Sequence, residues 1–126
     1  MKTVVVSIPN SLMAGGICKY LEQDSGLRVI RHDYREKISG MCLAAKADVL
    51  LAEARNYFPY TVSDWLTEHS AIKAKLPRCK LAIVVDENSC PETAKEVQEA
   101  YTKRLLEVFF YGTVSGEYVT AVIASL

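Results

Sequence analysis

Short runs of β-branched and other apolar residues alternate along the chain with longer segments in which apolar residues recur at helical spacing. Five such runs are predicted strands: Thr3–Ser7, Leu27–His32, Ala47–Ala52, Lys80–Val85 and Val108–Tyr111. Nearly continuous apolar runs are typical of strands that helices cover on both faces, whereas Leu27–His32 alternates apolar and basic residues and is expected near a sheet edge. The alternation predicts β-α-β units around a mainly parallel sheet.

The intervening segments carry the caps and apolar stripes of amphipathic helices. Asn10 is a cap candidate for the first helix, and Thr61 with Asp64 has the spacing of a capping box. Ser89 and Glu92 repeat that spacing at a later helix. The predicted helices are Ser11–Gln23, Tyr34–Ala45, Val62–Leu76, Pro91–Leu105 and Ser115–Leu126.

The length and composition agree with one ordinary folded domain. A chain of 126 residues can bury a hydrophobic core without disulfides or metals. Half of the residues are hydrophobic and 24% are charged, which excludes the composition of a disordered chain. We therefore expect residues 1–126 to form a single α/β domain.

The charge balance excludes several classes of partner. Lys plus Arg equals Asp plus Glu at 15 each, so there is no overall basic field to hold a nucleic acid. Arg28, Arg31 and Arg35 form a possible local patch, although Asp33 and Glu36 beside them are typical of a solvated surface. No apolar run approaches the roughly 20 residues of a membrane span, and no signal peptide is evident. We predict a cytoplasmic domain that by itself binds neither nucleic acid nor membrane.

The cysteines do not have the spacing of a zinc site. They are widely separated, and only two histidines are available as co-ligands: Cys18, Cys42, Cys79 and Cys90, with His32 and His69. We expect reduced, buried thiols. Cys90 precedes a predicted helix, whose dipole would favour a reactive thiolate. Because no general base lies beside it in the sequence, a structural role is favoured.

Candidate chemistry in a doubly wound sheet lies just outside the carboxyl ends of the strands. The residues at these positions are Ser7–Asn10, Asp33, Glu53–Asn56, Asp86–Ser89 and Tyr111–Thr113. Glu53, Asp86 and Glu87 either converge there to hold a divalent cation or remain hydrated turn acids. The aromatic loop after the third strand, with Tyr57, Phe58 and Tyr60, either faces a partner or folds onto the core.

Two segments resemble a known family. The seven-residue segment Ala47–Glu53 is similar to the Pro-Asp-(apolar)4-Asp segment that ends in the phosphoacceptor of bacterial response-regulator receiver domains. Val108–Gly112, followed by Ser115, Gly116 and Glu117, resembles the family's last strand, Lys-Pro turn and final helix. The resemblance covers essentially the whole chain. It implies a flavodoxin-like fold with five parallel strands in the order 2-1-3-4-5 and five helices.

The resemblance also implies that every functional element is altered. Glu53 takes the place of the phosphoacceptor aspartate, and Ser7 and Ile8 take the places of the acidic pair that binds Mg²⁺. The switch Ser or Thr is replaced by Val85, and the lysine after the fifth strand by Tyr111. The proline after that lysine is replaced by Gly112. Glu53 then either imitates the charge of the phosphorylated form or is a polar strand end.

The leading hypothesis is a pseudo-receiver in a signalling pathway, which acts by protein–protein interaction and is not an enzyme. It needs no metal or cofactor. The family commonly dimerises through its fourth helix, fifth strand and fifth helix, so the candidate anchors for a protein partner or a homodimer are Tyr101, Arg104, Tyr111 and Tyr118.

Two alternatives remain open. The chain is a receiver fragment of a longer transcription regulator with a DNA-binding output domain, or it is a small-ligand or redox enzyme on a flavodoxin-like scaffold. Against the enzyme, the first strand is followed by Ser-Ile-Pro-Asn, which is not a glycine-rich phosphate cradle. Gly15 and Gly16, within the first helix, are interpreted as sites of close helix packing.

Overall fold

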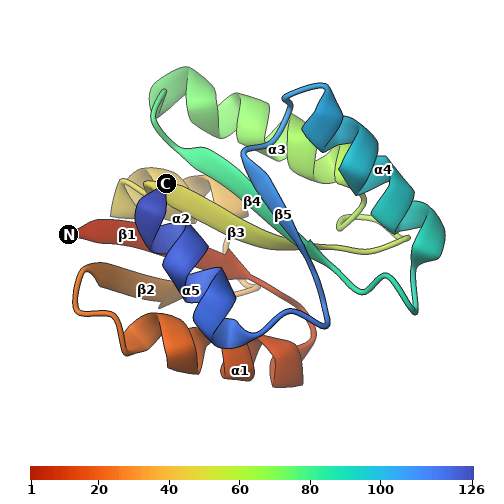
Figure 1. The fold of residues 1–126 in the computed structure, drawn as a ribbon. Coiled ribbons are helices and arrows are strands. Elements are labelled where there is room, and N and C mark those ends of the chain that lie inside the picture. Colours follow the sequence, from red (N-terminus) through yellow and green to blue (C-terminus); the bar gives the residue numbers. More distant parts are fainter.

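The computed structural model describes all 126 residues and contains one five-stranded sheet (Figure 1). Its strands are β1 (Lys2–Ser7), β2 (Leu27–Arg31), β3 (Val49–Ala54), β4 (Lys80–Val85) and β5 (Val108–Tyr111). They lie in the order β2-β1-β3-β4-β5, and every neighbouring pair is parallel. The predicted flavodoxin-like topology is confirmed, and so is the edge position of β2.

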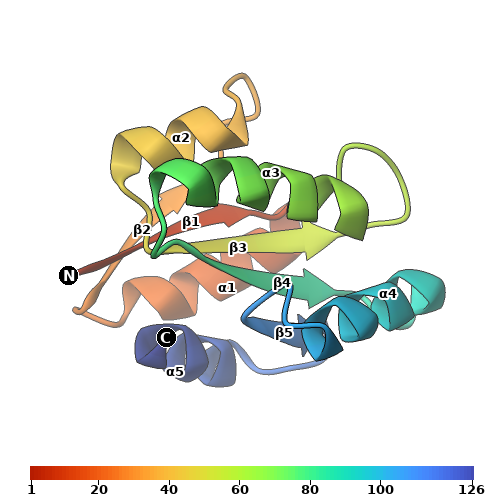
Figure 2. The same cartoon turned by 90° about the horizontal axis from the view of Figure 1, so that it is seen from above.

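Five helices cover the sheet on both faces. They are α1 (Ser11–Glu22), α2 (Ile38–Ala45), α3 (Val62–Lys75), α4 (Pro91–Thr102) and α5 (Gly116–Ser125). Helices α1 and α5 cover one face, and α2, α3 and α4 cover the other (Figure 2). No helix is long and apolar enough to cross a membrane.

The alternation of side chains along the strands divides the core into two layers. In β3, Leu50 packs with α2, α3 and α4, while Leu51 packs with α1 and α5, and both are fully buried. A fully buried leucine contributes about 1.5–3 kcal/mol relative to an exposed one. Because both faces are covered, the central strands read as continuous apolar runs, as the sequence predicts.

The predicted caps have mixed outcomes. Asn10 caps α1, since its side chain accepts a hydrogen bond from the amide of Met13, and Thr61 forms a complete capping box with Asp64. The predicted box at Ser89 is wrong. The Ser89 amide and hydroxyl both donate to the Asp86 carboxylate, and the N-cap of α4 is Cys90, while the helix begins at Pro91 as predicted.

Three predicted boundaries are also wrong. Helix α2 begins at Ile38 instead of Tyr34, because the Asp33 carboxylate accepts hydrogen bonds from the amide and guanidinium of Arg35 and holds a turn there. Helix α4 ends at Thr102 instead of Leu105, where Arg104 adopts a left-handed conformation with φ 60°.

The third correction places Glu53 inside a strand. Strand β3 runs from Val49 to Ala54, which pairs in register with Val85, instead of from Ala47 to Ala52. The ladder is extended because the Glu53 carboxylate has partners within the chain, as described below. A charged residue is therefore accommodated in a fully buried strand position.

The glycines of α1 are not packing contacts. A Cβ added at Gly15 or Gly16 would meet nothing within 4 Å. The close approach is instead at Gly116, where α5 begins and where an added Cβ would collide with the ring of Tyr20 on α1. The close packing predicted at Gly15 and Gly16 therefore occurs at Gly116 instead.

Candidate functional site

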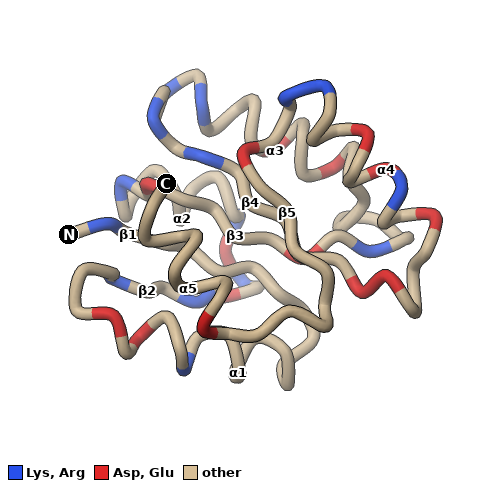
Figure 3. The backbone as a smooth tube through the Cα atoms, viewed as in Figure 1, with Lys and Arg blue, Asp and Glu red and all other residues tan.

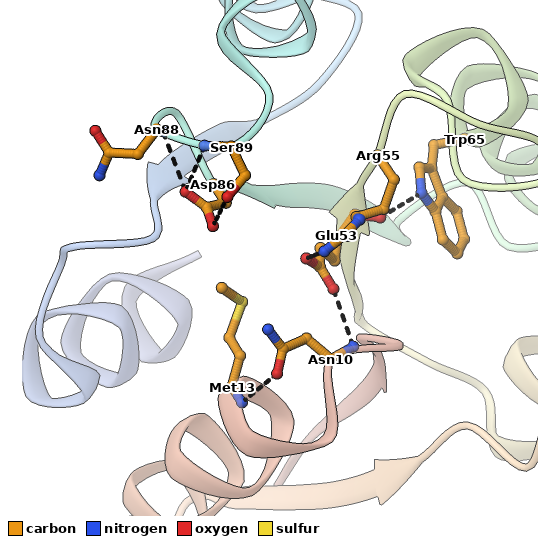
Figure 4. Close-up of polar contacts among 8 residues, drawn as sticks. All are labelled: Asn10, Met13, Glu53, Arg55, Trp65, Asp86, Asn88 and Ser89. Atoms are coloured by element: carbon orange, nitrogen blue, oxygen red, sulfur yellow. Dashed lines mark hydrogen bonds and ion pairs between the residues drawn. The ribbon is translucent and has the colours of Figure 1, made fainter.

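The Glu53 side chain lies at the carboxyl end of the sheet, on the face covered by α1, and is fully buried. One carboxylate oxygen, Oε2, is 2.9 Å from Nη1 of Arg55, and the other, Oε1, accepts a hydrogen bond of 3.2 Å from the amide of Asn10 (Figure 4). Both oxygens are therefore engaged within the chain.

The backbone around this ion pair is fixed from the neighbouring helix. The indole Nε1 of Trp65 donates a 2.9 Å hydrogen bond to the carbonyl oxygen of Glu53, which joins the end of β3 to α3. The hydrogen bond to Glu53 raises the pKa of the Arg55 guanidinium. Arg55 also lies over the ring of Tyr57, at 5.6 Å from the centroid, and its Nε is buried without a hydrogen-bond partner.

The positions of the family's acidic pair are occupied by a buried hydroxyl and a core side chain. Ile8 is 3% exposed and packs with α1 and α5. Ser7 is fully buried, and its Oγ lies 2.8 Å from Nδ1 of His32. Because Nε2 of His32 faces the carbonyl oxygen of Glu36 at 2.9 Å, Nε2 carries the proton and Nδ1 accepts from the serine. These two positions provide no carboxylate.

The positions of the switch residue and the lysine also lack the expected groups. Val85 is fully buried in the layer of α2, α3 and α4, and it pairs in register with Tyr111. The Tyr111 ring is 40% exposed and lies 5.6 Å from the ring of Phe109. The Gly112 amide donates to the carbonyl oxygen of Val85 at 2.8 Å. A backbone hydrogen bond therefore occupies the end of this strand.

Asp86 and Glu87 do not converge with Glu53. Asp86 accepts from the amides of Asn88 and Ser89 and from the Ser89 hydroxyl, and these bonds, those of Ser89 first, lower the pKa of its carboxyl group. Glu87 accepts from the amide of Gly112 at 3.1 Å. In Figure 4 Asp86 faces its own loop and is separated from Glu53. No group of three potential ligands gathers anywhere in the chain, so the cation-site hypothesis is wrong.

The thiols are buried, as predicted. All four cysteines are buried and free of disulfides, and burial raises the pKa of Cys42 to about 12 and that of Cys79 to about 11. Cys90 is 6% exposed at the N-cap of α4, and its side chain makes no capping bond there. Its burial agrees with a structural role.

In the aromatic loop after β3, one residue folds onto the core and two are exposed to solvent, so both predicted roles are represented. Tyr60 is partly buried and packs against the core beside Trp65, with ring centroids 6.3 Å apart. Tyr57 is about half exposed, and Phe58 is 81% exposed. Only the tip of this loop therefore offers a surface to a partner.

The four predicted interface residues do not form one cluster. Tyr101 and Tyr111 flank Phe109, at 5.2 and 5.6 Å between centroids, and the three make an aromatic row over α4 and β5. Tyr118 lies on the opposite face, 6.1 Å from Phe110. Arg104 lies beyond the end of α4 and lines a cavity at the amino end of the sheet.

Sequence reasoning missed the residues that close the site. Arg55 carried a usable signal, because residues two apart in a strand lie on the same face, which places it beside Glu53. His32 and Ser7 are 25 residues apart and meet only through the pairing of β1 with β2. Trp65 reaches Glu53 from another helix, and no local pattern indicates that contact.

Comparisons with known proteins identify the fold. No family model matches the chain, and no curated protein matches it in sequence. Solved structures do match. The signal receiver domain of the putative response regulator NarL from Mycobacterium tuberculosis is 13% identical with a TM-score of 0.71, and the match covers 98% of this chain and 94% of that one.

Two further structures agree. A response regulator from Thermotoga maritima is 15% identical with a TM-score of 0.71, and the match covers 99% of this chain and 96% of that one. HP1043, an orphan response regulator of H. pylori, is 18% identical with a TM-score of 0.66, covering 98% and 94%. At these identities the similarity is one of fold. The chain therefore has the fold of a response-regulator receiver domain.

Proposed function

We propose that this chain is a pseudo-receiver, a signalling module that acts through protein contacts and takes up no phosphoryl group at the carboxyl end of its sheet. The observation that carries the proposal is the buried ion pair between Glu53 and Arg55. The pair involves the residue that the family resemblance aligns with the phosphoacceptor, and it is complete within the chain.

The donor set at this end argues against metal-assisted phosphoryl transfer. Mg²⁺ requires oxygen ligands in near-octahedral geometry and is usually held by one or two carboxylates. The carboxylate at the end of β3 is that of Glu53, and its two oxygens already contact Arg55 and Asn10. Ser7 and Ile8 add no charge, so a cation would have to displace Arg55 from its partner.

The geometry also argues against Glu53 as a nucleophile. A productive attack needs the reacting atoms within about 3–3.5 Å and in line. The Glu53 side chain is one methylene longer than aspartate, is fully buried, and is held at both oxygens. The pair also holds one negative and one positive charge in place. This supports a module that stays in a single conformational state.

Protein contact is supported by the aromatic row of Tyr101, Phe109 and Tyr111. Tyr101 and Tyr111 are 46% and 40% exposed, and they lie beside β5, whose outer edge is unpaired. Aromatic anchors of this kind are enriched at interfaces. We assign this row to a protein partner or a second copy of the chain.

Intact mass spectrometry after incubation with acetyl phosphate and Mg²⁺ tests the proposal. We expect an unchanged mass, because neither the metal site nor a free carboxylate is available. A phosphoryl adduct that disappears in Glu53→Gln would overturn the proposal. An adduct that persists in that variant lies elsewhere and leaves position 53 unmodified.

Sedimentation velocity over a concentration series tests the contact surface. We expect Tyr111→Ser to weaken any self-association, whereas Tyr34→Ser, which removes an exposed tyrosine beside β2, leaves it unchanged. If the chain stays monomeric at every concentration, the homodimer is excluded and the row is left to a different partner.

Several of the structural neighbours favour a second candidate, a receiver portion of a longer transcription regulator. One neighbour is a DNA-binding response regulator of the LuxR family from Staphylococcus aureus. Another, RcsB from Salmonella enterica bound to promoter rprA, is matched over 98% of this chain and 67% of that one. A DNA-binding domain encoded in frame after codon 126 would favour this candidate, and a stop codon there would exclude it.

A further inference from the structure

A cavity of about 490 Å³ lies at the amino end of the sheet, opposite the Glu53 site. It is bounded by the end of α3, the α3–β4 connection, the start of β4 and the α4–β5 connection. Its volume is within the range of small-ligand pockets. Five basic residues line it: Lys2, Lys73, Arg78, Lys80 and Arg104.

Four of these five cations have no internal partner. Lys2 donates to the carbonyl oxygens of Ile123, Ala124 and Leu126. In contrast, Lys73, Arg78, Lys80 and Arg104 make no side-chain hydrogen bond, and the three ion pairs of the chain are all elsewhere. Unpaired like charges around one cavity repel one another, and a bound anion would offset that repulsion.

Acidic residues do not neutralise the cavity. Only Asp48 and Glu107 line it, and Asp48 accepts a hydrogen bond from the amide of Thr3, which orients its carboxylate toward β1. Figure 3 shows the same imbalance along the backbone, with Lys and Arg positions gathered along the α3–β4 connection and at the turn after α4. The net charge of zero therefore conceals a local basic region.

The helix dipole accounts for only part of this charge. Lys73 lies in the last turn of α3, where a cation interacts favourably with the helix carboxyl end. That effect is confined to the last turn, whereas Arg78 follows the helix and Lys80 begins β4. Arg104 is brought to the cavity by the left-handed turn after α4. The helix dipole therefore does not account for the position of Arg78, Lys80 or Arg104 at the cavity.

A buried histidine also faces the cavity. His69 is 9% exposed, and its Nε2 donates to the carbonyl oxygen of Cys79 at 2.7 Å. Its other ring nitrogen, Nδ1, makes no hydrogen bond within the chain, although His69 is a lining residue. This nitrogen is not enclosed by the protein, so it is available for a hydrogen bond with a bound ligand.

Apolar residues complete the lining. Pro77 and Leu105 are exposed at its rim, and Leu81 and Leu106 are buried beneath it. Cations beside apolar side chains match a ligand with a charged group and an uncharged ring. Arginine in particular binds phosphate through paired N–H donors.

We propose that this cavity binds a small organic polyphosphate, with Arg78, Lys80 and Arg104 on the phosphates, His69 at its inner wall and Leu105 against the organic moiety. The proposal does not depend on the proposed function, since the two sites lie at opposite ends of the sheet and share no residue.

Isothermal titration calorimetry with ATP and with pyrophosphate, both without Mg²⁺, tests this inference. We expect ATP to bind at one saturable site, pyrophosphate to bind more weakly, and adenosine not to bind. Arg78→Gln with Lys80→Gln is expected to weaken ATP binding about tenfold or more, because each lost charged hydrogen bond contributes substantially.

The matched control is Lys19→Gln with Arg28→Gln, which removes the same charge from exposed positions on α1 and β2. We expect this variant to bind ATP as the wild type does. Thermal unfolding of both double variants checks that they remain folded.

Three results would overturn the inference. These are the absence of heat of binding for both phosphates at millimolar concentration, an equal loss of affinity in the control variant, and tighter binding of a single-stranded oligonucleotide than of ATP. The last outcome would make the region a nucleic-acid surface instead of a small-molecule site.

Discussion

The two ends of the sheet differ in whether their charged side chains are paired. At the carboxyl end, Glu53 is fully buried and its charge is matched by Arg55 within the same strand region. At the amino end, Arg78, Lys80 and Arg104 surround a cavity without any ion pair. The end at which receivers carry out their chemistry is closed, and the opposite end has unsatisfied charge.

This difference shows what a fold does and does not determine. The doubly wound topology places ligand sites at the carboxyl ends of strands in most proteins of this class. Here an arginine two residues after Glu53 fills that place. We therefore expect an anion to bind at the opposite end of the sheet.

Removing one partner of the buried pair has the largest expected effect. Arg55→Met leaves the Glu53 carboxylate buried with only the Asn10 amide as partner, and we expect a loss of about 3 kcal/mol in the free energy of unfolding. Replacing both residues with methionine removes the buried charge as well, so the double variant is expected within about 1 kcal/mol of the wild type. Urea unfolding measures both. If Arg55→Met costs nothing, the carboxyl end is not closed by this pair.

The contact of α1 with α5 is expected to be the next most sensitive. Gly116→Ala forces a methyl group into the ring of Tyr20, and we expect it to cost about 1–3 kcal/mol. Gly16→Ala is the matched control, because a methyl group there meets nothing and raises helix propensity by about 1 kcal/mol. Thermal unfolding is expected to move in opposite directions for the two. The same direction for both would show that the packing is not as described.

Removing cations at the amino end should have the smallest effect on stability. We expect Arg78→Gln with Lys80→Gln to change the free energy of unfolding by less than about 0.5 kcal/mol, since neither side chain has an internal partner. Salt is expected to stabilise the wild type more than this variant, because it screens the repulsion among the cations. A loss as large as that of Arg55→Met would remove the contrast between the two ends.

Much of the fold could be predicted from the sequence, because the central strands are continuous apolar runs and the helices have apolar residues at helical spacing. Errors arose where side chains overrode local signals. The Ser89 hydroxyl donates to Asp86, so Ser89 is not the predicted N-cap. The turn formed by Asp33 and Arg35 makes α2 begin later in the sequence than predicted. The partnered Glu53 allowed β3 to continue beyond its apolar run.

The candidate site was less predictable. The family resemblance located Glu53, Val85 and Tyr111, but it could not indicate that Arg55 pairs with Glu53. The amino-end cavity was missed because Lys2 and Arg104 join Lys73, Arg78 and Lys80 only in the folded chain, and the overall charge of zero gave no sign of it. The patch considered instead, around Arg31, contains Arg35 already paired with Asp33.

The most direct test of the closed carboxyl end is an amide NMR titration with Mg²⁺ and beryllofluoride, a phosphoryl mimic that is present in the structure of the isolated REC domain of RcsB from Salmonella enterica. If Arg55 holds Glu53 as described, the amide signals of Asn10, Glu53 and Arg55 keep their positions throughout the titration. Saturable shifts centred on these three residues would contradict the account.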